Sequence, residues 1–287
     1  MTVSSKKCLI CKRHNDTIHA HSDPDTNEVW LWCCGCGRGY GLRTYCHLAG
    51  ISLTEFLKLD FDFIEAKPNE INKIDWPAHF VPMSDPRAKV GVDYVASRGI
   101  ELKGDMYFDI EREGIVFPMY YHDVFAGGQI RLIKPWERDG DVVKMLTMPG
   151  TRSGLLFYNY AQKSFINDIK GVIITEGAFN ALAIQQSLDK LYGGIVKNPW
   201  KVMSTSGCSL TKHQVDKLKE LKEAGIKIVS ALDSDEPGLK GLAKLSKAEA
   251  ITHYALTSDP SIDWNDMLSE FGDDFAKHFL SLIRRVA

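Results

Sequence analysis

The chain has 287 residues, 44% of them hydrophobic and 25% charged, which is the composition of an ordinary globular protein with room for two or three domains. Its formal net charge of −2 excludes a surface that is basic throughout, so a nucleic-acid binder with this balance must gather its basic residues on one face. No segment approaches the roughly 18 apolar residues that a membrane span requires. Residues 1–7 lack the apolar core of a signal peptide, so we expect no membrane partner and a protein that stays where it is made.

The N-terminal region is predicted to be a small domain of short strands and one helix. Aromatic-rich strands are expected at 29–33 and 40–45, separated by a glycine-rich turn. Ser52 and Glu55 have the spacing of a capping box, which predicts a short helix over 53–59.

Six of the seven cysteines fall within the first 46 residues. In a chain without an export signal, this clustering favours a metal site over disulfides. Cys8 and Cys11 form one Cys-x-x-Cys pair, and Cys33 and Cys36 form a second. Four thiolates at this spacing predict a closed, tetrahedral, structural zinc site, and no histidine is then needed as a ligand. Cys34 is the alternative to Cys33 as the third ligand.

Aromatic and basic side chains are interleaved in the same domain. Aromatic faces beside cations suit stacking on unpaired bases and contact with phosphates, so we predict that this domain binds single-stranded DNA. The alternative is that the aromatic residues simply form the small core of the domain. The predicted DNA-binding residues are Trp30, Trp32, Tyr40, Arg38 and Arg43.

The middle of the chain is predicted to be rich in strands. Residues 65–86 contain four prolines and little apolar periodicity, so they are expected to form a linker, with Trp76 and Phe80 as residues that attach it to the next domain. A helix is expected over 90–97. Strands separated by polar and glycine-rich turns are expected at 106–110, 114–120, 129–133 and 142–146.

From residue 171 onward, apolar strands alternate with amphipathic helices. This alternation predicts a parallel sheet covered by helices, in which functional residues gather at the carboxyl ends of the strands. The expected strands are 172–175, 201–205, 227–232 and 251–255. The expected helices are 179–188, 211–223 and 239–250, and the final residues are predicted to form a terminal helix that can dock elsewhere.

Acidic residues follow several of these strands. Glu176 comes directly after the first strand, Asp233 and Asp235 after the third, and Asp263 follows the last. Because the strands are parallel, these carboxylates should emerge at one edge of the sheet. Converging carboxylates repel one another unless a hard divalent cation neutralises them, which predicts a magnesium site.

Three segments resemble the signatures of the Toprim fold: Thr-Glu-Gly-Ala-Phe-Asn-Ala-Leu at 175–182, Asp-Ser-Asp-Glu-Pro-Gly at 233–238 and Asp-Trp-Asn-Asp at 263–266. Bacterial-type primases, topoisomerases, some nucleases and the RecR recombination protein share this fold. The order of zinc ribbon, linker, strand-rich basic segment and Toprim resembles the primase half of bacteriophage primase–helicases. Arg98-Gly99, residues 114–118 and residues 153–156 add to that resemblance.

The resemblance implies an α/β fold in which a Toprim-type parallel sheet follows a strand-rich basic subdomain and a separate small zinc ribbon. The expected domains are a zinc-ribbon template-binding domain at 1–64, a linker at 65–86, a basic subdomain of an RNA polymerase core at 87–168, a Toprim subdomain at 169–262 and a helical segment at 263–287.

The implied activity is that of a DNA primase, a DNA-directed RNA polymerase that makes short RNA primers by two-metal nucleotidyl transfer. Glu176, Asp233 and Asp235 would be catalytic and, with Asp263, would hold Mg²⁺ or Mn²⁺. Such relatives usually carry Asp where this chain has Asn180, which removes one charge near the metals. The implied partners are single-stranded DNA and ribonucleoside triphosphates, in the cytoplasm of a bacterium or a phage-infected host.

Binding of a nucleotide triphosphate requires cations opposite the metals. The candidates are Arg131, Lys134 and Lys144 on adjoining strands, with Arg98 and Arg152 behind them. The chain contains no P-loop motif of its own, so either a separate replicative helicase supplies unwound template, which we expect, or the protein acts without one.

Two other functions fit the same motifs. A DNA-binding clamp of the RecR kind also combines zinc and Toprim modules, but it would not need the long strand-rich segment in the middle of the chain. A Toprim nuclease shares the acidic residues but normally lacks a base-reading ribbon. An assay with template, ribonucleotides and magnesium separates the three.

Overall fold

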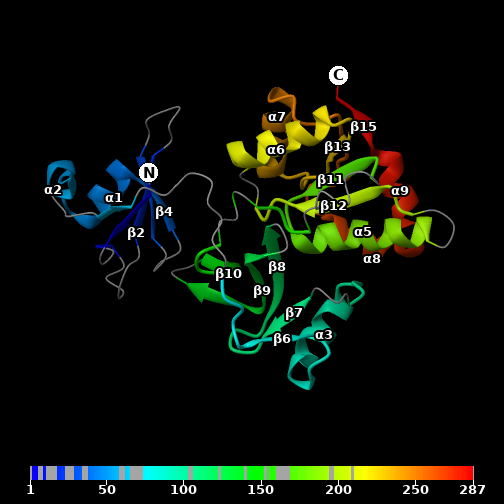
Figure 1. The fold of residues 1–287 in the computed structure, drawn as a ribbon, viewed down its shortest axis with the longest axis horizontal. Helices are drawn as coiled ribbons and strands as arrows, with labels where there is room; N and C mark the ends of the chain where they lie inside the picture. The colour runs from blue at the N-terminus through cyan, green and yellow to red at the C-terminus, as the bar shows by residue number, and fades with distance from the viewer. Residues whose placement is uncertain are drawn as a thin grey trace. The chain divides into compact units, whose positions relative to one another are not determined.

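The computed structural model describes residues 2–5, 9–10, 18–22, 29–33, 38–57, 62–64, 74–102, 106–121, 124–138, 141–151, 154, 156–159, 169–193, 197–207 and 210–286. The chain divides into two compact units, Met1–Glu70 and Ile71–Ala287, and Figure 1 shows the elements of each. Within the described part of the chain, no helix combines the length and the apolar character that a membrane span requires.

The first unit is an antiparallel sheet with two short helices. Its strands lie in the order β4-β3-β2-β1-β5. Their bounds are Thr2–Ser5 (β1), Ile18–Ser22 (β2), Val29–Cys33 (β3), Arg38–Gly41 (β4) and Asp62–Ile64 (β5). The helices are Leu42–Ala49 (α1) and Leu53–Leu57 (α2), and the predicted capping box is present, with the backbone N–H of Ser52 donating to the Glu55 carboxylate at 2.7 Å.

The prediction of a strand over 40–45 was wrong, because the chain enters α1 at Leu42. Leu42, Tyr45, Cys46 and Ala49 recur with the helical spacing of i, i+3, i+4 and i+7, and this spacing places all four on the face that packs into the core of the unit. The aromatic content of the segment favours a strand, but the apolar period is that of a helix, and burial of this face decides the outcome.

The second unit contains two sheets, of which the first is antiparallel, in the order β10-β9-β8-β7-β6. Its strands are Phe80–Pro82 (β6), Tyr107–Asp109 (β7), Gly114–Tyr121 (β8), Val124–Arg138 (β9) and Asp141–Thr147 (β10). A 3₁₀ turn, Pro86–Ala88 (η1), leads into the helix Lys89–Ser97 (α3). The four predicted strands and the predicted helix are therefore present.

The predicted linker extends too far toward the C-terminus. Strand β6 lies inside residues 65–86 and pairs with β7. The ring of Trp76 packs edge-to-face on Phe80 and Tyr107, with centroids 5.7 and 4.5 Å away. The backbone N–H of Ile74 donates to the carbonyl of Phe125 at 3.1 Å. From Ile74 onward, the chain therefore belongs to the second unit.

The other sheet of this unit has the order β12-β11-β13-β14-β15. Its first four strands are parallel, which confirms the prediction of a parallel α/β sheet. The strands are Gly171–Thr175 (β11), Trp200–Ser204 (β12), Lys227–Ser230 (β13), His253–Tyr254 (β14) and Arg284–Arg285 (β15). The helices are Ala178–Tyr192 (α5), Lys212–Glu223 (α6), Glu236–Lys247 (α7), Trp264–Phe271 (α8) and Phe275–Leu282 (α9), with a 3₁₀ turn at Gly272–Asp274 (η3).

Helices cover both faces of this parallel sheet (Figure 1). Along β11, Ile173 packs into a core formed with α5, α8 and α9, whereas Val172 and Ile174 pack into a second core formed with α6 and α7. Because the strand is buried on both faces, its sequence is an unbroken apolar run rather than an alternating one.

The C-terminal residues are part of this unit, whereas the sequence suggested a helix that docks elsewhere. Phe275 and Phe279 of α9 are buried in the same core as α5, and β15 pairs antiparallel with β14 at the edge of the sheet.

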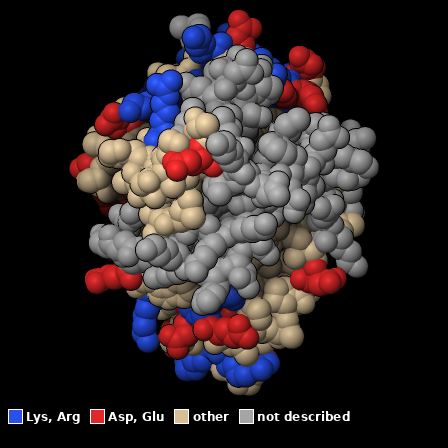
Figure 2. Space-filling view, turned by 90° about the vertical axis from the view of Figure 1, so that its left-hand side faces the viewer, with Lys and Arg blue, Asp and Glu red and all other residues tan. Residues whose placement is uncertain are grey.

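On the face drawn in Figure 2, basic and acidic side chains lie side by side over the described residues.

Trp264 should be one of the main anchors of α8. Its side chain is fully buried and its indole N–H donates to the carbonyl of Ala231 at 2.8 Å. We expect Trp264→Phe to lower the free energy of unfolding by about 1–3 kcal/mol, because it opens a small cavity and leaves that carbonyl unpaired. Urea unfolding followed by circular dichroism measures this loss.

The matched control is Trp136→Phe, because the Trp136 side chain is 44% exposed. It should change the free energy of unfolding by no more than about 0.5 kcal/mol. Equal losses in the two variants would contradict the assignment of Trp264 as an anchor.

Candidate active site

Acidic side chains from separate strands meet at the carboxyl edge of the parallel sheet. Glu176 follows β11 and Asp233 follows β13, and these strands are parallel neighbours in register from Gly171 and Lys227. A Cβ atom added to Gly238 would overlap the carbonyl of Asp233 and lie 2.9 Å from Oε1 of Glu176. The Glu176 carboxylate and the Asp233 carbonyl therefore both lie beside Gly238, in the first turn of the helix that follows Asp233.

Two of the acidic residues also cap helices. Asp235 is the N-cap of α7, where its Oδ1 accepts from the N–H of Gly238 at 2.9 Å. Asp263 is the N-cap of α8, where its Oδ1 accepts from the N–H groups of Asn265 and Asp266 at 2.9 and 2.8 Å. A side-chain oxygen at the N-cap satisfies an N–H group that has no partner within the helix. Capping therefore holds both carboxylates at the rim of the sheet.

Asn180 on α5 joins the acidic centre to α8. Its side-chain Nδ2 donates to Oδ1 of Asp233 at 3.0 Å, and its Oδ1 accepts from the backbone N–H of Asn265 at 3.2 Å. These partners determine the orientation of the amide, because a carboxylate only accepts and a backbone N–H only donates.

The carboxylates raise one another's pKa. Burial, followed by the charges of Asp233 and Asp235, raises the pKa of Glu176 to about 7, against a hydrogen bond from the Asp233 backbone that lowers it. Burial, followed by the charges of Asp263 and Asp235, raises the pKa of Asp233 to about 6. Burial also raises the pKa of Asp263. Oε1 of Glu176 is buried without a hydrogen-bond partner among the described residues.

Such a site favours a bound cation, because unpaired buried carboxylates are costly. Among the described residues, no group of three His, Cys, Asp or Glu side chains is already arranged as a metal site. Magnesium is commonly held by one or two carboxylates together with water and substrate phosphates, so a complete set of protein ligands is not required.

Two of the predicted nucleotide-binding cations lie around Phe179, the second residue of α5. Nη2 of Arg98 is 3.8 Å from Oδ2 of Asp263, and its Cζ is 5.6 Å from the centre of the Phe179 ring. Nε of Arg131 donates to the hydroxyl of Tyr94 at 3.3 Å, and the ring of Tyr94 packs edge-to-face on Phe179.

The predicted lysines lie on the exposed surface of the antiparallel sheet. Nζ of Lys134 pairs with Oε2 of Glu113 at 3.4 Å, and Lys144 is exposed on β10. Arg152 lies outside the described residues. Of the predicted cations, the structure thus brings Arg98 into contact with the acidic residues.

Most of the predicted zinc and DNA contacts lie outside the described residues. This holds for Cys8, Cys11 and Cys36, and for the side chains of Cys33, Trp30, Trp32 and Arg38. Arg43 is exposed on α1. Tyr40 is buried and packs edge-to-face on Tyr45 at 5.7 Å, so for this residue the alternative of a core position holds.

The buried amides of this region form a group that the sequence does not reveal. Gln186 lies on α5 and is 3% exposed, while Asn265 at the start of α8 is 2% exposed. The available signal was a run of polar residues inside a helix that is apolar on all sides, because buried polar side chains need hydrogen-bond partners. The identity of those partners was not visible in the sequence.

Residues 173–268 match the family described as Toprim-like. No curated protein matches the chain in sequence. The chain is similar to a solved DnaG catalytic core, at 15% identity over 71% of this chain and 76% of that one, with a TM-score of 0.51. It is similar to a DnaG primase catalytic domain bound to single-stranded DNA, at 12% identity over 71% and 77% of the two chains, with a TM-score of 0.50.

A third similar structure contains the zinc-binding and RNA polymerase domains of the Aquifex aeolicus primase. The identity is 17% over 95% of this chain and 77% of that one, with a TM-score of 0.50. The chain therefore contains a Toprim-like domain and shares its fold with the catalytic cores of DnaG primases.

Because the carboxylates of the acidic centre repel one another, removing one negative charge should stabilise the metal-free protein. Below the ordinary pKa of 4.5 Glu176 is protonated both folded and unfolded; between 4.5 and about 7 the folded state holds the extra proton, so stability falls as pH rises through this window. We expect the free energy of unfolding of Glu176→Gln to exceed that of the natural chain by about 1–2 kcal/mol at pH 8 and to equal it near pH 4. Each pKa unit corresponds to about 1.36 kcal/mol, and solvent screening reduces this value. Urea unfolding in EDTA measures this difference.

Glu223→Gln, at the exposed end of α6, is the matched control and should leave the pH dependence unchanged. If Glu176→Gln followed the same pH curve as the natural chain, the carboxylates would not be coupled.

Proposed function

We propose that the chain is a DNA primase that synthesises short RNA primers on single-stranded DNA. The single observation that carries the proposal is the meeting of Glu176 and the Asp233 segment at the carboxyl edge of a Toprim-like sheet. The similarity of the fold to primase catalytic cores supports the same assignment. We infer that the protein works in the cytoplasm of a bacterium or a phage-infected host, with a separate replicative helicase as a partner.

The donors at the rim fit Mg²⁺ or Mn²⁺. Glu176 presents a buried carboxylate oxygen that has no hydrogen-bond partner among the described residues, and burial together with the charges of Asp233 and Asp235 raises its pKa. Carboxylate oxygens are the ligands that hard divalent cations prefer. We infer that Glu176, Asp233, Asp235 and Asp263 hold these ions, which when bound would lower the pKa of the primer 3′-hydroxyl and stabilise the pyrophosphate leaving group.

The residues of the chain would bind and orient the reactants. Glu176 has a pKa near neutrality and could accept the proton of the attacking hydroxyl. Arg98, beside Asp263, would bind the triphosphate, because a guanidinium offers several donors to phosphate oxygens. Arg131, Lys134 and Lys144, on β9 and β10 of the antiparallel sheet, would contact the nucleotide or the template.

The N-terminal unit would read the template. We infer that Cys8, Cys11, Cys33 and Cys36 bind a structural zinc ion and that Trp30, Trp32, Arg38 and Arg43 contact single-stranded DNA. Tyr40 is assigned to the core of this unit instead.

A synthesis assay tests the proposal directly. Purified protein with a single-stranded template, ribonucleotides and Mg²⁺ should yield short RNA whose sequence depends on the template. Glu176→Gln should lower synthesis at least about 100-fold, because it removes a ligand and a proton acceptor together. Glu223→Gln should retain full synthesis.

Retention of full synthesis by Glu176→Gln would sink the assignment of this centre. Cleavage of the DNA without RNA synthesis would instead support a Toprim nuclease. DNA binding without either reaction would support a clamp of the RecR kind.

The zinc site has its own test. The purified chain should contain stoichiometric zinc by inductively coupled plasma mass spectrometry, and Cys11→Ser and Cys36→Ser should each lose it, because a structural site needs all four ligands. Cys46→Ala is the matched control and should keep its zinc, because Cys46 is buried in the core of the unit. Comparing Cys33→Ser with Cys34→Ser identifies the third ligand, and zinc retained in all of these variants would exclude the site.

A further inference from the structure

Arg98 reaches the acidic centre from a tight turn that ends α3. The N–H groups of Arg98 and Ile100 both donate to the carbonyl of Val95, at 3.1 and 3.2 Å. Gly99 lies between them at a φ of 68°, in the left-handed region that glycine adopts without strain. The position of the guanidinium therefore depends on how firmly this turn, residues 98–101, is held.

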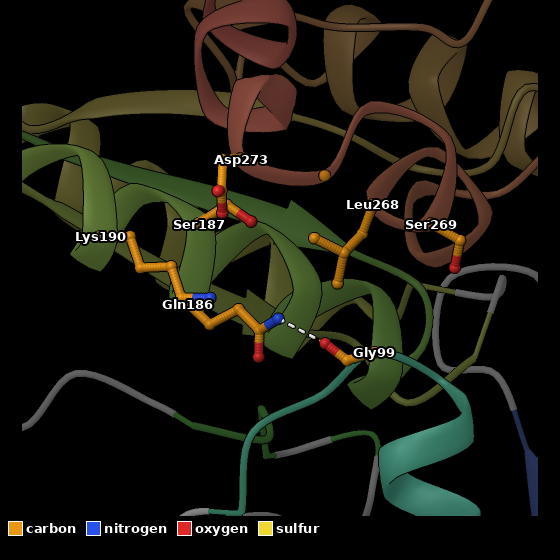
Figure 3. A pocket seen from close by; sticks show the side chains of 8 residues that line it. Gly99, Gln186, Ser187, Lys190, Leu268, Ser269 and Asp273 are labelled. Atoms are coloured by element: carbon orange, nitrogen blue, oxygen red, sulfur yellow. Dashed lines mark hydrogen bonds between the residues drawn. The ribbon is translucent and has the colours of Figure 1, made fainter.

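Packing does not hold the outer side of the turn. A pocket of about 230 Å³ lies behind it, between α5, α8 and η3 (Figure 3). A Cβ atom added to Gly99 would meet the side chain of Leu268 at 3.6 Å and nothing nearer. Ile100 anchors the turn in the apolar core, but on the side of the pocket the backbone of Gly99 depends on hydrogen bonds more than on close packing.

Buried amides supply those hydrogen bonds. Nε2 of Gln186 donates to the carbonyl of Gly99 at 2.7 Å, the contact drawn in Figure 3, and its Oε1 accepts from the N–H of Glu101 at 2.9 Å. Nδ2 of Asn265 donates to the carbonyl of Arg98 at 2.7 Å. Gln186 and Asn265 are 3% and 2% exposed, so both side chains are largely shielded from water.

The same set of amides connects the turn to the carboxylates. The backbone N–H of Asn265 donates to Asn180, and Asn180 donates to Asp233. A continuous chain of hydrogen bonds thus runs from Asp233 through α5 and the start of α8 to the backbone of Arg98. A shift of the turn would have to break at least one bond of a buried polar network, which is costly.

We propose that Gln186 and Asn265 are positioning residues that hold the Arg98 turn so that the guanidinium is ready to bind the nucleotide triphosphate. Nε of Arg98 has no hydrogen-bond partner among the described residues, and Nη2 lies 3.8 Å from Asp263, so the guanidinium keeps donor capacity for an anion. An arginine fixed in advance gives up less conformational freedom when the anion binds. The inference rests on the proposed function for the identity of the anion.

The test compares two neighbouring glutamines on α5 in the full-length chain. Gln186→Met removes both bonds to the turn at nearly constant volume. It should raise the KM for ribonucleotides about tenfold and change kcat less than about twofold, because it weakens binding without altering the acidic centre.

Gln185→Met is the matched control. Gln185 is 7% exposed and bonds instead to β12, with the N–H of Val202 donating to its Oε1 at 2.8 Å. Gln185→Met should lower the thermal stability about as much as Gln186→Met does, but it should leave the KM for ribonucleotides unchanged. An equal rise of the KM in both variants would mean that the effect is general destabilisation, and the proposal would be overturned.

A double-mutant cycle asks whether Gln186 acts through Arg98. In an Arg98→Ala background, Gln186→Met should have no further effect on the KM, since the guanidinium that it positions is absent. If the two substitutions raised the KM independently, so that the rise in the double variant were the product of the two single rises, the proposal would be refuted. If Gln186→Met does not fold, Asn265→Leu removes the bond to the Arg98 carbonyl from the other side and should give the same result.

Titration with ATP and Mg²⁺ separates this inference from the proposed function. If the chain binds ATP but makes no RNA, the same double-mutant cycle is measured with the Kd for ATP in place of the KM. Non-additive losses of affinity would then support the positioning role while rejecting primer synthesis. Unchanged affinity in Arg98→Ala would reject the positioning role whatever the polymerising activity.

Discussion

The repulsion between carboxylates at the ends of neighbouring parallel strands is the constraint on which the rest of this site depends. Pairing of β11 with β13 brings Glu176 close to the Asp233 segment, and the backbones of the two segments stay together while the sheet remains paired. The sheet is held by apolar cores on both of its faces. The energy of those cores opposes the repulsion, so the site is a charged rim supported by a rigid interior.

Hydrogen bonding directs this charge. Asp235 and Asp263 each satisfy the first turn of a helix, so their positions are set by the start of that helix and not by the presence of a cation. Asn180 gives Asp233 a donor. Glu176 is left with a buried oxygen that nothing in the described part of the chain satisfies. An acid whose pKa is raised and which keeps an unsatisfied buried oxygen is typical of functional sites.

The parallel sheet and its acidic edge were predictable because strands buried on both faces are continuous apolar runs and their ends share one edge. Helix α1 was missed because aromatic residues favour strands locally, while burial of Tyr45 and Cys46 selects the helix. Strands β6 and β15 are too short to give a period of their own and depend on their partners. The contact of Gln186 with Gly99 joins residues 87 positions apart, and the sequence carries no sign of it.

The burial of α5 has a consequence for how such a site can vary over evolution. Every residue from Ala178 to Leu188 is enclosed, so a change of size on this helix disturbs the folded core before it alters the chemistry. Carboxylate and amide side chains have nearly the same shape. Exchange between them at Asn180 would therefore be a route by which a lineage changes the charge of the acidic rim while conserving the architecture beneath it.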